Sequence, residues 1–186
     1  DVYKRQVYDS DEKFILVQKL IDLAHIRSTT RKIRGIVKKT PLQESLNYSQ
    51  KYNSKIFFKR EDLQDVKSFK IRGAYTKILS VEKTIAQNGL VCASAGNHAQ
   101  GFAVSCSLLD YNGIVFMPHS TPSLKVGLVK KFGGKNIKIK LVGENFSKAY
   151  KAAMDYCIRN KKTFIHPFDD IKVIEGQATL FFEVID

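Results

Sequence analysis

The second half of the chain alternates short apolar runs with longer segments in which apolar residues recur every three or four positions. Short apolar runs predict buried strands, and the periodic segments predict helices that pack on them. The expected order is a strand at 90–94, a helix at 98–109, a strand at 114–117, a helix at 122–132, a strand at 137–142, a helix at 145–160 and a strand at 163–166. This alternation favours a parallel sheet joined by helical crossovers.

The expected helix at 122–132 is flanked by residues that are typical of helix ends. Thr121 is placed to cap its amino end, and Pro122 would occupy the first helical position. Gly133 would end the helix.

The pattern before residue 90 is less regular. Phe14 to Ile26 shows the apolar spacing of a helix, and a basic connector follows it through Arg34. The Thr40-Pro41 pair predicts an extended segment, because the residue before a proline avoids the helical region. The apolar run within 55–59 predicts a strand that leads into a charged segment.

The amino-acid composition indicates the broad class of protein to which the chain belongs. The 186 residues are 44% apolar, which suits a globular protein with one core. No stretch approaches the roughly 18 to 20 uninterrupted apolar residues of a membrane span, and no secretory leader is visible. We therefore expect a cytoplasmic protein with no membrane partner. Cys92, Cys106 and Cys157 are odd in number and far apart, which favours packing residues over disulfides or a metal site.

The formal net charge of +13 is concentrated in residues 125–162, which hold eleven Lys or Arg residues against Glu144 and Asp155. One interpretation is a surface that binds nucleic acid. Lys138 and Lys140, however, alternate with apolar residues, as expected for the solvated face of a strand. We favour solvated faces of a strand and a helix, and we expect no nucleic-acid partner.

Both ends of the chain look artificial. The first residue is an aspartate and residues 1–6 resemble a translated sequencing adapter, so residues 1–10 are expected to be a non-native or disordered start. Residues 180–185 form an apolar run without a signal that would end a helix. The expectation from these features is a fragment of a longer protein.

Two short segments carry candidate chemistry. The first, Ser68-Phe69-Lys70-Ile71-Arg72-Gly73-Ala74, places a lysine next to an aromatic ring at the start of a helical pattern. An aldehyde cofactor needs such an amine to form a Schiff base, and an apolar wall for its ring. The second, Ser94-Ala95-Gly96-Asn97-His98-Ala99-Gln100, is a small-residue turn from a strand into a helix, where backbone N–H groups can bind an anion. Each segment alone is weak evidence, since most lysines at helix starts are solvated.

Together the two segments resemble a known family. Lys59-Arg60-Glu61-Asp62-Leu63-Gln64, continued by residues 68–75, is similar to the cofactor-lysine region of threonine dehydratases, which are pyridoxal-phosphate enzymes of the tryptophan-synthase-β-like fold. Residues 91–101 are similar to the substrate loop of that family. Three further segments follow in the family's order: Phe116-Met117-Pro118, Lys131-Phe132-Gly133-Gly134 and Phe164-Ile165-His166-Pro167-Phe168-Asp169-Asp170. The resemblance runs from about Thr40 to about Glu183.

The resemblance implies a role for each matching residue. Lys70 would hold pyridoxal 5'-phosphate covalently and remove the α-proton of the substrate. Phe69 would pack on the cofactor ring, although its position is equally that of a core residue, and Asn97 would donate to the phenolate oxygen of the cofactor. The substrate carboxylate would be bound by the turn residues Ser94, Ala95, Gly96, Asn97, His98 and Gln100. The His98 side chain is expected to be structural, and Arg72 is expected to pack or to pair with an acid.

The resemblance also implies an α/β protein with two parallel-sheet domains, the larger one truncated. Residues 11–89 would be the N-terminal part of the large pyridoxal-phosphate domain, 90–167 the small α/β domain, and 168–186 the start of the return to the large domain. The glycine-rich phosphate loop of the family would lie beyond Asp186. The chain is therefore expected to be inactive alone, and the full-length protein is expected to be a homo-oligomer.

The implied reaction is the dehydration and deamination of L-threonine to 2-oxobutanoate and ammonia, the first step of isoleucine biosynthesis. Lys59-Arg60-Glu61-Asp62 resembles the biosynthetic more than the degradative dehydratases. Ala95 stands where serine racemases have a second serine, and because alanine cannot exchange a proton it disfavours racemisation. A serine dehydratase, a serine racemase and a non-catalytic basic binding module stay open as alternatives. No metal site is predicted.

Overall fold

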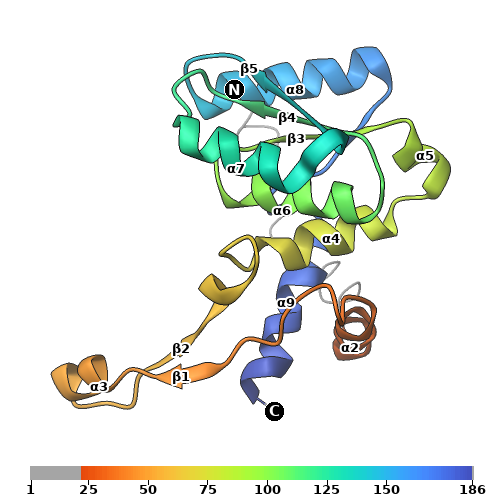
Figure 1. The fold of residues 1–186 in the computed structure, drawn as a ribbon. Helices are drawn as coiled ribbons and strands as arrows, with labels where there is room; N and C mark the ends of the chain where they lie inside the picture. Colours follow the sequence, from red (N-terminus) through yellow and green to blue (C-terminus); the bar gives the residue numbers. More distant parts are fainter. Residues whose placement is uncertain (1–21, 186) are drawn as a thin grey trace, which may run out of the picture.

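The computed structural model describes residues 22–185 (Figure 1). The α-helices are α2 (Leu23–Lys32), α3 (Leu46–Tyr52), α4 (Lys70–Ser80), α5 (Lys83–Gln87), α6 (Asn97–Leu108), α7 (Ser123–Gly133), α8 (Phe146–Asn160) and α9 (Ile171–Ile185). The strands are β1 (Leu42–Glu44), β2 (Phe57–Lys59), β3 (Leu90–Ala93), β4 (Gly113–Met117), β5 (Ile137–Leu141) and β6 (Thr163–Phe164). Two short 3₁₀ helices complete the order, η2 (Glu61–Leu63) and η3 (Gly134–Asn136).

A four-stranded parallel sheet with the order β5-β4-β3-β6 organises the second half of the chain. Each strand is followed by a helix before the next strand begins, which is the connection that parallel strands require. Strand β3 lies in the centre between β4 and β6, and all four of its residues are buried, as expected for a strand covered on both faces. The strands, helices and parallel arrangement predicted for 90–166 are confirmed to within a few residues.

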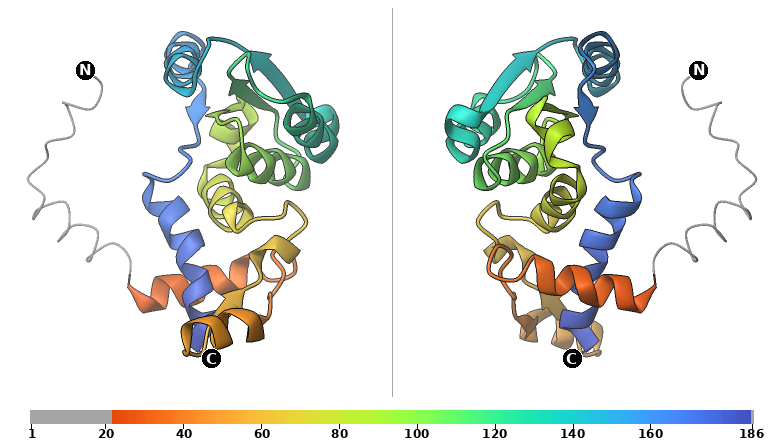
Figure 2. Two further views of the ribbon diagram at one scale, coloured as in Figure 1. Left: turned by 90° about the vertical axis from the view of Figure 1, so that its left-hand side faces the viewer. Right: turned by 90° about the vertical axis from the view of Figure 1, so that its right-hand side faces the viewer.

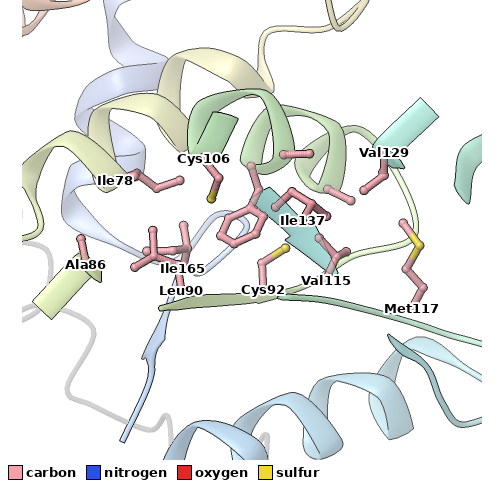
Figure 3. Packing of buried hydrophobic residues seen from close by; sticks show 13 residues of the cluster. Ile78, Ala86, Leu90, Cys92, Cys106, Val115, Met117, Val129, Ile137 and Ile165 are labelled. Atoms are coloured by element: carbon pink, nitrogen blue, oxygen red, sulfur yellow. The ribbon is translucent and has the colours of Figure 1, made fainter. Parts of the chain in front are cut away.

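Helices cover both faces of this sheet. On one face α6 and α7 pack against residues such as Cys92 and Val115 (Figure 3). The Phe102 ring of α6 belongs to the same cluster and is completely buried. On the other face α8 packs against Val91 and Phe116. Apolar side chains removed from water on both sides of one sheet supply the main driving force for this part of the fold.

Three helices form a second layer beyond α6. Helix α4 packs on α6, α9 packs on α4, and α2 packs on α9. The contact between α4 and α9 is close, because a Cβ atom added to Gly176 would lie 2.5 Å from the backbone oxygen of Arg72. Glycine is therefore needed at this crossing. Residues 70–80 precede the parallel sheet in the sequence and residues 171–185 follow it, and these two segments thus lie side by side (Figure 2).

A hairpin extends away from this body. Strands β1 and β2 pair antiparallel, with Gln43 opposite Phe58, and α3 lies between them in the sequence (Figure 1). The ring of Tyr48 packs edge-on against Phe58, with 5.6 Å between the ring centroids. The described residues before Leu90 contain this antiparallel pair, so the second parallel sheet stays a prediction.

The structure corrects several local predictions. The basic connector expected up to Arg34 is wrong, because α2 continues to Lys32 and buries Ile26 and Thr29. The earlier part of the helix expected from Phe14 lies outside the described residues. The short helices α3 and α5 were not expected, since neither has a long apolar period.

The ends of α7 are shifted by one residue from the prediction. Pro122 has a non-helical ψ of 138° and is the residue before the helix rather than its first residue, so the cap predicted at Thr121 is wrong. At the other end, Gly133 is the last helical residue. Gly134 adopts φ +51° after it, a left-handed conformation that glycine reaches without strain.

Two expectations from composition are confirmed. Cys92, Cys106 and Cys157 are buried and unpaired, which fits packing residues. Lys138 and Lys140 are exposed on the edge strand β5, as solvated-face residues should be. Within residues 22–185 no helix is long and apolar enough to cross a membrane.

Candidate functional site

Lys70 is the first residue of α4, and Phe69 directly precedes the helix. The Nζ atom of Lys70 lies 5.3 Å from the centroid of the Phe69 ring and donates a hydrogen bond to the backbone oxygen of Pro167, at 3.0 Å. Phe69 is 40% exposed, so its ring is open to a ligand on one side and is not a core residue. The structure thus places an amine and an exposed aromatic ring together.

Burial lowers the pKa of the Lys70 amine from its ordinary value. No carboxylate among residues 22–185 forms an ion pair with this amine. Asp170, an acid of the neighbouring loop, pairs instead with Lys77 at 2.7 Å. A lysine with a lowered pKa and only a neutral hydrogen-bond acceptor has a larger fraction of free amine, which is the nucleophilic form.

The second motif lies at the carboxyl end of β3. Ser94 follows the strand, and its Oγ atom accepts a hydrogen bond from the backbone N–H of Gly96, at 3.2 Å. Helix α6 then begins at Asn97, which is exposed, and no side chain of the described part of the chain caps this end of the helix. Ala95 is half-buried within the turn. The first N–H groups of α6 are therefore available to bind an anion.

The two motifs are brought together by the packing of α4 on α6. A Cβ atom added to Gly101 would lie 3.1 Å from the backbone oxygen of Lys70, so the start of α4 passes directly over the second turn of α6. His98, in the first turn of α6, lies close enough to Lys70 for the charge of the lysine to act on the pKa of the histidine. Segments about 25 residues apart in sequence thus meet at one edge of the sheet.

His98 and Gln100 point into the protein rather than into solvent, and both are buried. The His98 Nε2 atom is 3.2 Å from the backbone oxygen of Ile165. Desolvation by burial lowers the pKa of His98 to about 4, although the hydrogen bond that His98 donates to the Ile165 oxygen acts in the opposite direction. His98 is therefore neutral near pH 7, and its side chain has a structural partner, as the sequence led us to expect.

The loop after β6 completes the site, and sequence reasoning assigned it no role. Besides Pro167, it contributes His166, whose Nδ1 atom accepts hydrogen bonds from the backbone N–H groups of Phe168 and Asp169. Asp170 accepts from the N–H groups at the start of α9. Every residue has a backbone oxygen, so the residue type of Pro167 does not indicate this role. Only the position of the segment after an expected strand could have indicated it.

Arg72, two residues after Lys70, has an entirely different environment. Its guanidinium group is 1% exposed and makes paired hydrogen bonds to Glu61, at 2.8 and 2.9 Å, and to Glu183, at 2.8 and 3.0 Å. Burial alone would lower the pKa of Arg72, but these two carboxylates raise it. The expectation that Arg72 pairs with an acid is confirmed.

Comparison with known proteins places this site in a family. Residues 33–186 match the model of a family described as pyridoxal-phosphate dependent enzymes. The chain belongs to this family. The biosynthetic L-threonine dehydratase IlvA of Bacillus subtilis is 47% identical over 167 residues, which are 90% of this chain and 40% of that protein. The chain thus spans about two fifths of the length of the curated relatives it matches.

Solved structures give the same result for the fold. Threonine deaminase isoform 2 of Solanum lycopersicum superposes with a TM-score of 0.80 at 32% identity, over 95% of this chain and 46% of that one. Maize serine racemase superposes with a TM-score of 0.82 at 28% identity, over 89% of this chain and 50% of that one. The tryptophan-synthase-β-like fold predicted from the sequence is confirmed, as is the cofactor of the family.

The chemistry of the residues around Lys70 fits pyridoxal phosphate. The amine of Lys70 is uncharged more readily than an ordinary lysine, and the Phe69 ring offers an exposed apolar face beside it. The Ser68 Oγ and His98 Nδ1 atoms are buried near this end of α4 and lack a hydrogen-bond partner within residues 22–185. Buried polar atoms normally have a partner, so polar groups without one are consistent with a site that is completed by a ligand.

Proposed function

We propose that the protein that carries this chain is a pyridoxal-phosphate-dependent L-threonine dehydratase. It would convert L-threonine to 2-oxobutanoate and ammonia in isoleucine biosynthesis. The observation that carries the proposal is the Lys70 amine: partly desolvated, free of ion pairs with carboxylates of residues 22–185, and next to an exposed Phe69 ring. Relatives named as biosynthetic threonine dehydratases support the choice of substrate.

Bound pyridoxal phosphate would supply an electron-withdrawing ring that stabilises the negative charge left when the α-proton of the amino acid is removed. Lys70 would hold the cofactor through its Nζ atom, and once released it would take the α-proton on the same atom. Phe69 would cover one side of the cofactor ring and restrict its tilt. Asn97, exposed at the start of α6, would donate a hydrogen bond to the cofactor's phenolate oxygen.

The turn Ser94–Gly96 and the start of α6 would bind the substrate carboxylate. The N–H groups of Ser94 and Gly96 already donate to the Phe116 oxygen and to Ser94 Oγ, so the donors would be those at the start of α6, where the positive end of the helix dipole also favours an anion. Fixing the carboxylate orients the Cα–H bond toward the lysine, and orientation of this kind contributes a large part of the rate in enzymes. The β-hydroxyl would leave as water, and one water molecule would be taken up again when the released enamine is hydrolysed to 2-oxobutanoate and ammonia.

Serine racemisation is the second candidate, because a serine racemase superposes on this chain. Racemisation requires proton delivery to the face of the substrate opposite Lys70. Ala95, in the turn at the carboxyl end of β3, has no group that carries a proton. The absence of a hydroxyl at this position favours elimination over racemisation.

The proposal extends to the organisation of the protein. Residues 90–167 would form the small domain, since they contain the parallel sheet and the helices on both its faces. Residues 11–89 and 168–186 would belong to the large domain, and the packing of α9 on α4 supports this grouping. A cytoplasmic homo-oligomer remains our expectation for the full-length protein.

Two experiments test the proposal. In the first, the purified chain is incubated with pyridoxal phosphate, reduced with borohydride and mapped by mass spectrometry. We expect the label on Lys70, and a label confined to Lys67 or Lys77 would contradict the site. A Lys151→Ala variant, altered on the exposed face of α8, serves as the control and should label normally.

In the second experiment, residues 33–186 replace the matching segment of the Bacillus subtilis relative, which provides a full-length setting. We expect the chimera to form 2-oxobutanoate from L-threonine and to lose this activity with Lys70→Ala. Formation of D-serine from L-serine at a rate comparable to elimination would favour the racemase. A chimera that binds cofactor at Lys70 but forms neither product would contradict both functions.

A further inference from the structure

Three side chains of the site converge on a single five-residue segment, Ile165–Asp169. His98 of α6 contacts the backbone oxygen of Ile165, at 3.2 Å from Nε2. Lys70 of α4 donates to the backbone oxygen of Pro167, at 3.0 Å. His166, within the segment, accepts the N–H groups of the two residues that follow Pro167, at 3.3 and 2.7 Å. The Pro167 oxygen, which accepts from the Lys70 amine, thus lies between Ile165, which is bonded to His98, and Phe168, which is bonded to His166.

The direction of the His98 hydrogen bond follows from its partner. A backbone oxygen only accepts, so Nε2 must carry the hydrogen and Nδ1 must carry the lone pair. Burial lowers the pKa of His98 to about 4 and keeps the ring neutral near pH 7, with this one N–H to donate. The side chain therefore supplies one donor in a fixed direction.

The segment is also held by the sheet and by its own covalent geometry. The N–H of Ile165 donates to the backbone oxygen of Val91 in β3, at 2.8 Å. Pro167 is buried, and its ring fixes φ, which reduces the conformational freedom of the backbone at the carbonyl that Lys70 uses. The carbonyl oxygen of Ile165 accepts from His98. Both the N–H and the carbonyl of Ile165, two residues before Pro167, therefore have hydrogen-bond partners.

A neutral carbonyl suits a reactive amine. A carboxylate at the same place would favour the charged ammonium and reduce the fraction of free amine. Among residues 22–185, His98 from α6 and His166 from the loop lie close enough for the charge of Lys70 to act on their pKa values. Asp169 and Asp170 act on the pKa of His166, and Asp170 is paired with Lys77. The Pro167 oxygen orients the amine without adding negative charge.

We propose that His98 is a positioning residue for Lys70: its ring N–H holds the Ile165–Pro167 backbone so that the Pro167 oxygen keeps the Lys70 amine beside Phe69. This inference rests on the proposed function in one respect only, that Lys70 is the reactive group. It assigns the His98 side chain a purpose for the reaction that is distinct from binding of the substrate by the backbone of the turn.

The test measures the reactivity of Lys70 in the cofactor-free chain. The rate of acetylation of Lys70 is followed by mass spectrometry between pH 7 and 11, with the exposed Lys151 as internal reference. His98→Leu removes the N–H donor, and His98→Gln replaces it with an amide N–H of similar reach. Ser105→Ala is the matched control, because it removes another buried hydrogen bond of α6, from Ser105 Oγ to the backbone oxygen of Gly101.

We expect Lys70 to react at lower pH than Lys151 in the unaltered chain and in Ser105→Ala. In His98→Leu the pH midpoint for Lys70 should rise toward that of Lys151, with about tenfold less reaction at pH 8 for each unit of rise. His98→Gln should restore most of the difference. A folded His98→Leu variant with an unchanged Lys70 midpoint, or a His98→Gln variant that behaves like His98→Leu, would overturn the proposal.

A measurement on the unaltered chain covers the case in which His98→Leu fails to fold. Nitrogen-15 NMR of the His98 ring distinguishes the two neutral tautomers. The proposal requires the hydrogen on Nε2, and a hydrogen on Nδ1 would overturn it. Failure of the proposed function would give a different result. Lys70 of the unaltered chain would then take no borohydride-stable label from pyridoxal phosphate.

Discussion

Lys70 and Arg72 are two basic residues on the same turn of α4, but they differ in burial and in their hydrogen-bond partners. Arg72 is buried, and both of its edges are occupied by carboxylates, Glu61 on one side and Glu183 on the other. Lys70 is partly exposed, and its hydrogen-bond acceptor within residues 22–185 is a neutral one, the Pro167 oxygen. One cation is fully neutralised by its neighbours, and the other is kept free of ion pairs with the acids of residues 22–185.

The difference follows from helix geometry. Two residues along an α-helix are separated by about 200°, so Lys70 and Arg72 leave α4 on nearly opposite sides. Arg72 meets η2 and the far end of α9, where the chain places two glutamates. Lys70 meets the loop after β6, where the nearby Asp170 is engaged by Lys77. The chemical role of a cation here depends on which acids reach it, and the helix face decides that.

Removing the amine of Lys70 should have the largest effect. Lys70→Ala is expected to abolish covalent attachment of pyridoxal phosphate and all 2-oxo acid formation in the chimera, because the variant removes the amine that we propose as both nucleophile and base. The free energy of unfolding should change by less than about 1 kcal/mol, since the side chain is partly solvated and has no ionic partner within residues 22–185. Urea unfolding and peptide mapping check both parts. Residual turnover near the level of unaltered Lys70 would contradict the assignment.

Removing the guanidinium of Arg72 should mainly affect stability. Arg72→Leu leaves the buried Glu61 without its cationic partner and Glu183 with Lys59 alone, and breaking such a network typically costs about 3–5 kcal/mol. Urea unfolding monitored by circular dichroism measures the loss, with Lys70→Ala as the control on the same helix turn. A loss below about 1 kcal/mol would show that the network contributes little to stability. Arg72 and Lys70 would then not differ in their contribution to the free energy of unfolding.

The neutral His98 should make the fold sensitive to acid. Because burial lowers its folded pKa to about 4, below the ordinary value near 6.5, the unfolded chain binds more protons at intermediate pH. This stabilising contribution is complete above about pH 6.5 and falls as the pH drops toward 4. Between pH 7 and 4.5 the loss should be about 2 kcal/mol. His98→Gln should reduce the difference between urea unfolding at these two pH values, and an equal difference in both proteins would contradict the shift.

Lys59 is the second basic residue that pairs with Glu183, so it tests the ion-pair network independently of Arg72. Its amine donates to Glu183 and to the backbone oxygen of Thr40, and the side chain is 13% exposed. Lys59→Met should cost about 1–2 kcal/mol, as expected for a charged hydrogen bond at a partly buried position. Lys151→Met on α8 provides the matched surface control, with a change within about 0.5 kcal/mol. Equal effects of the two substitutions would contradict the network.

Glu183 should titrate as part of the same network. Burial alone would raise its pKa, but hydrogen bonds from Arg72 and Lys59 outweigh burial and hold it below the ordinary glutamate value. The stabilising contribution is therefore present above about pH 4.3 and is lost as the pH falls through the lower folded pKa. Glu183→Gln should weaken the loss of stability in this acid range. The same acid dependence in the variant would show that other carboxylates are responsible.

Much of the fold could be predicted because its signals are local. Runs such as 90–94 and periodic segments such as 145–160 carry their own hydrophobic pattern, and alternating them leaves a parallel sheet as the favoured solution. The prediction failed where a segment's burial depends on a distant partner. Helix α2 continues through a basic stretch because it packs on α9, where Thr29 donates to Glu175, and nothing in the local pattern indicates that contact.

The sequence by itself determined which groups are available: an amine beside an aromatic ring at one helix start, and a small-residue turn at another. Only the tertiary structure decided what those groups meet. The backbone oxygen of Pro167 lies 97 residues after Lys70, and Glu183 lies 111 residues after Arg72. Residue type sets the charge a side chain can carry, whereas the charge it does carry depends on desolvation and on neighbours, which exist only once distant segments have packed together.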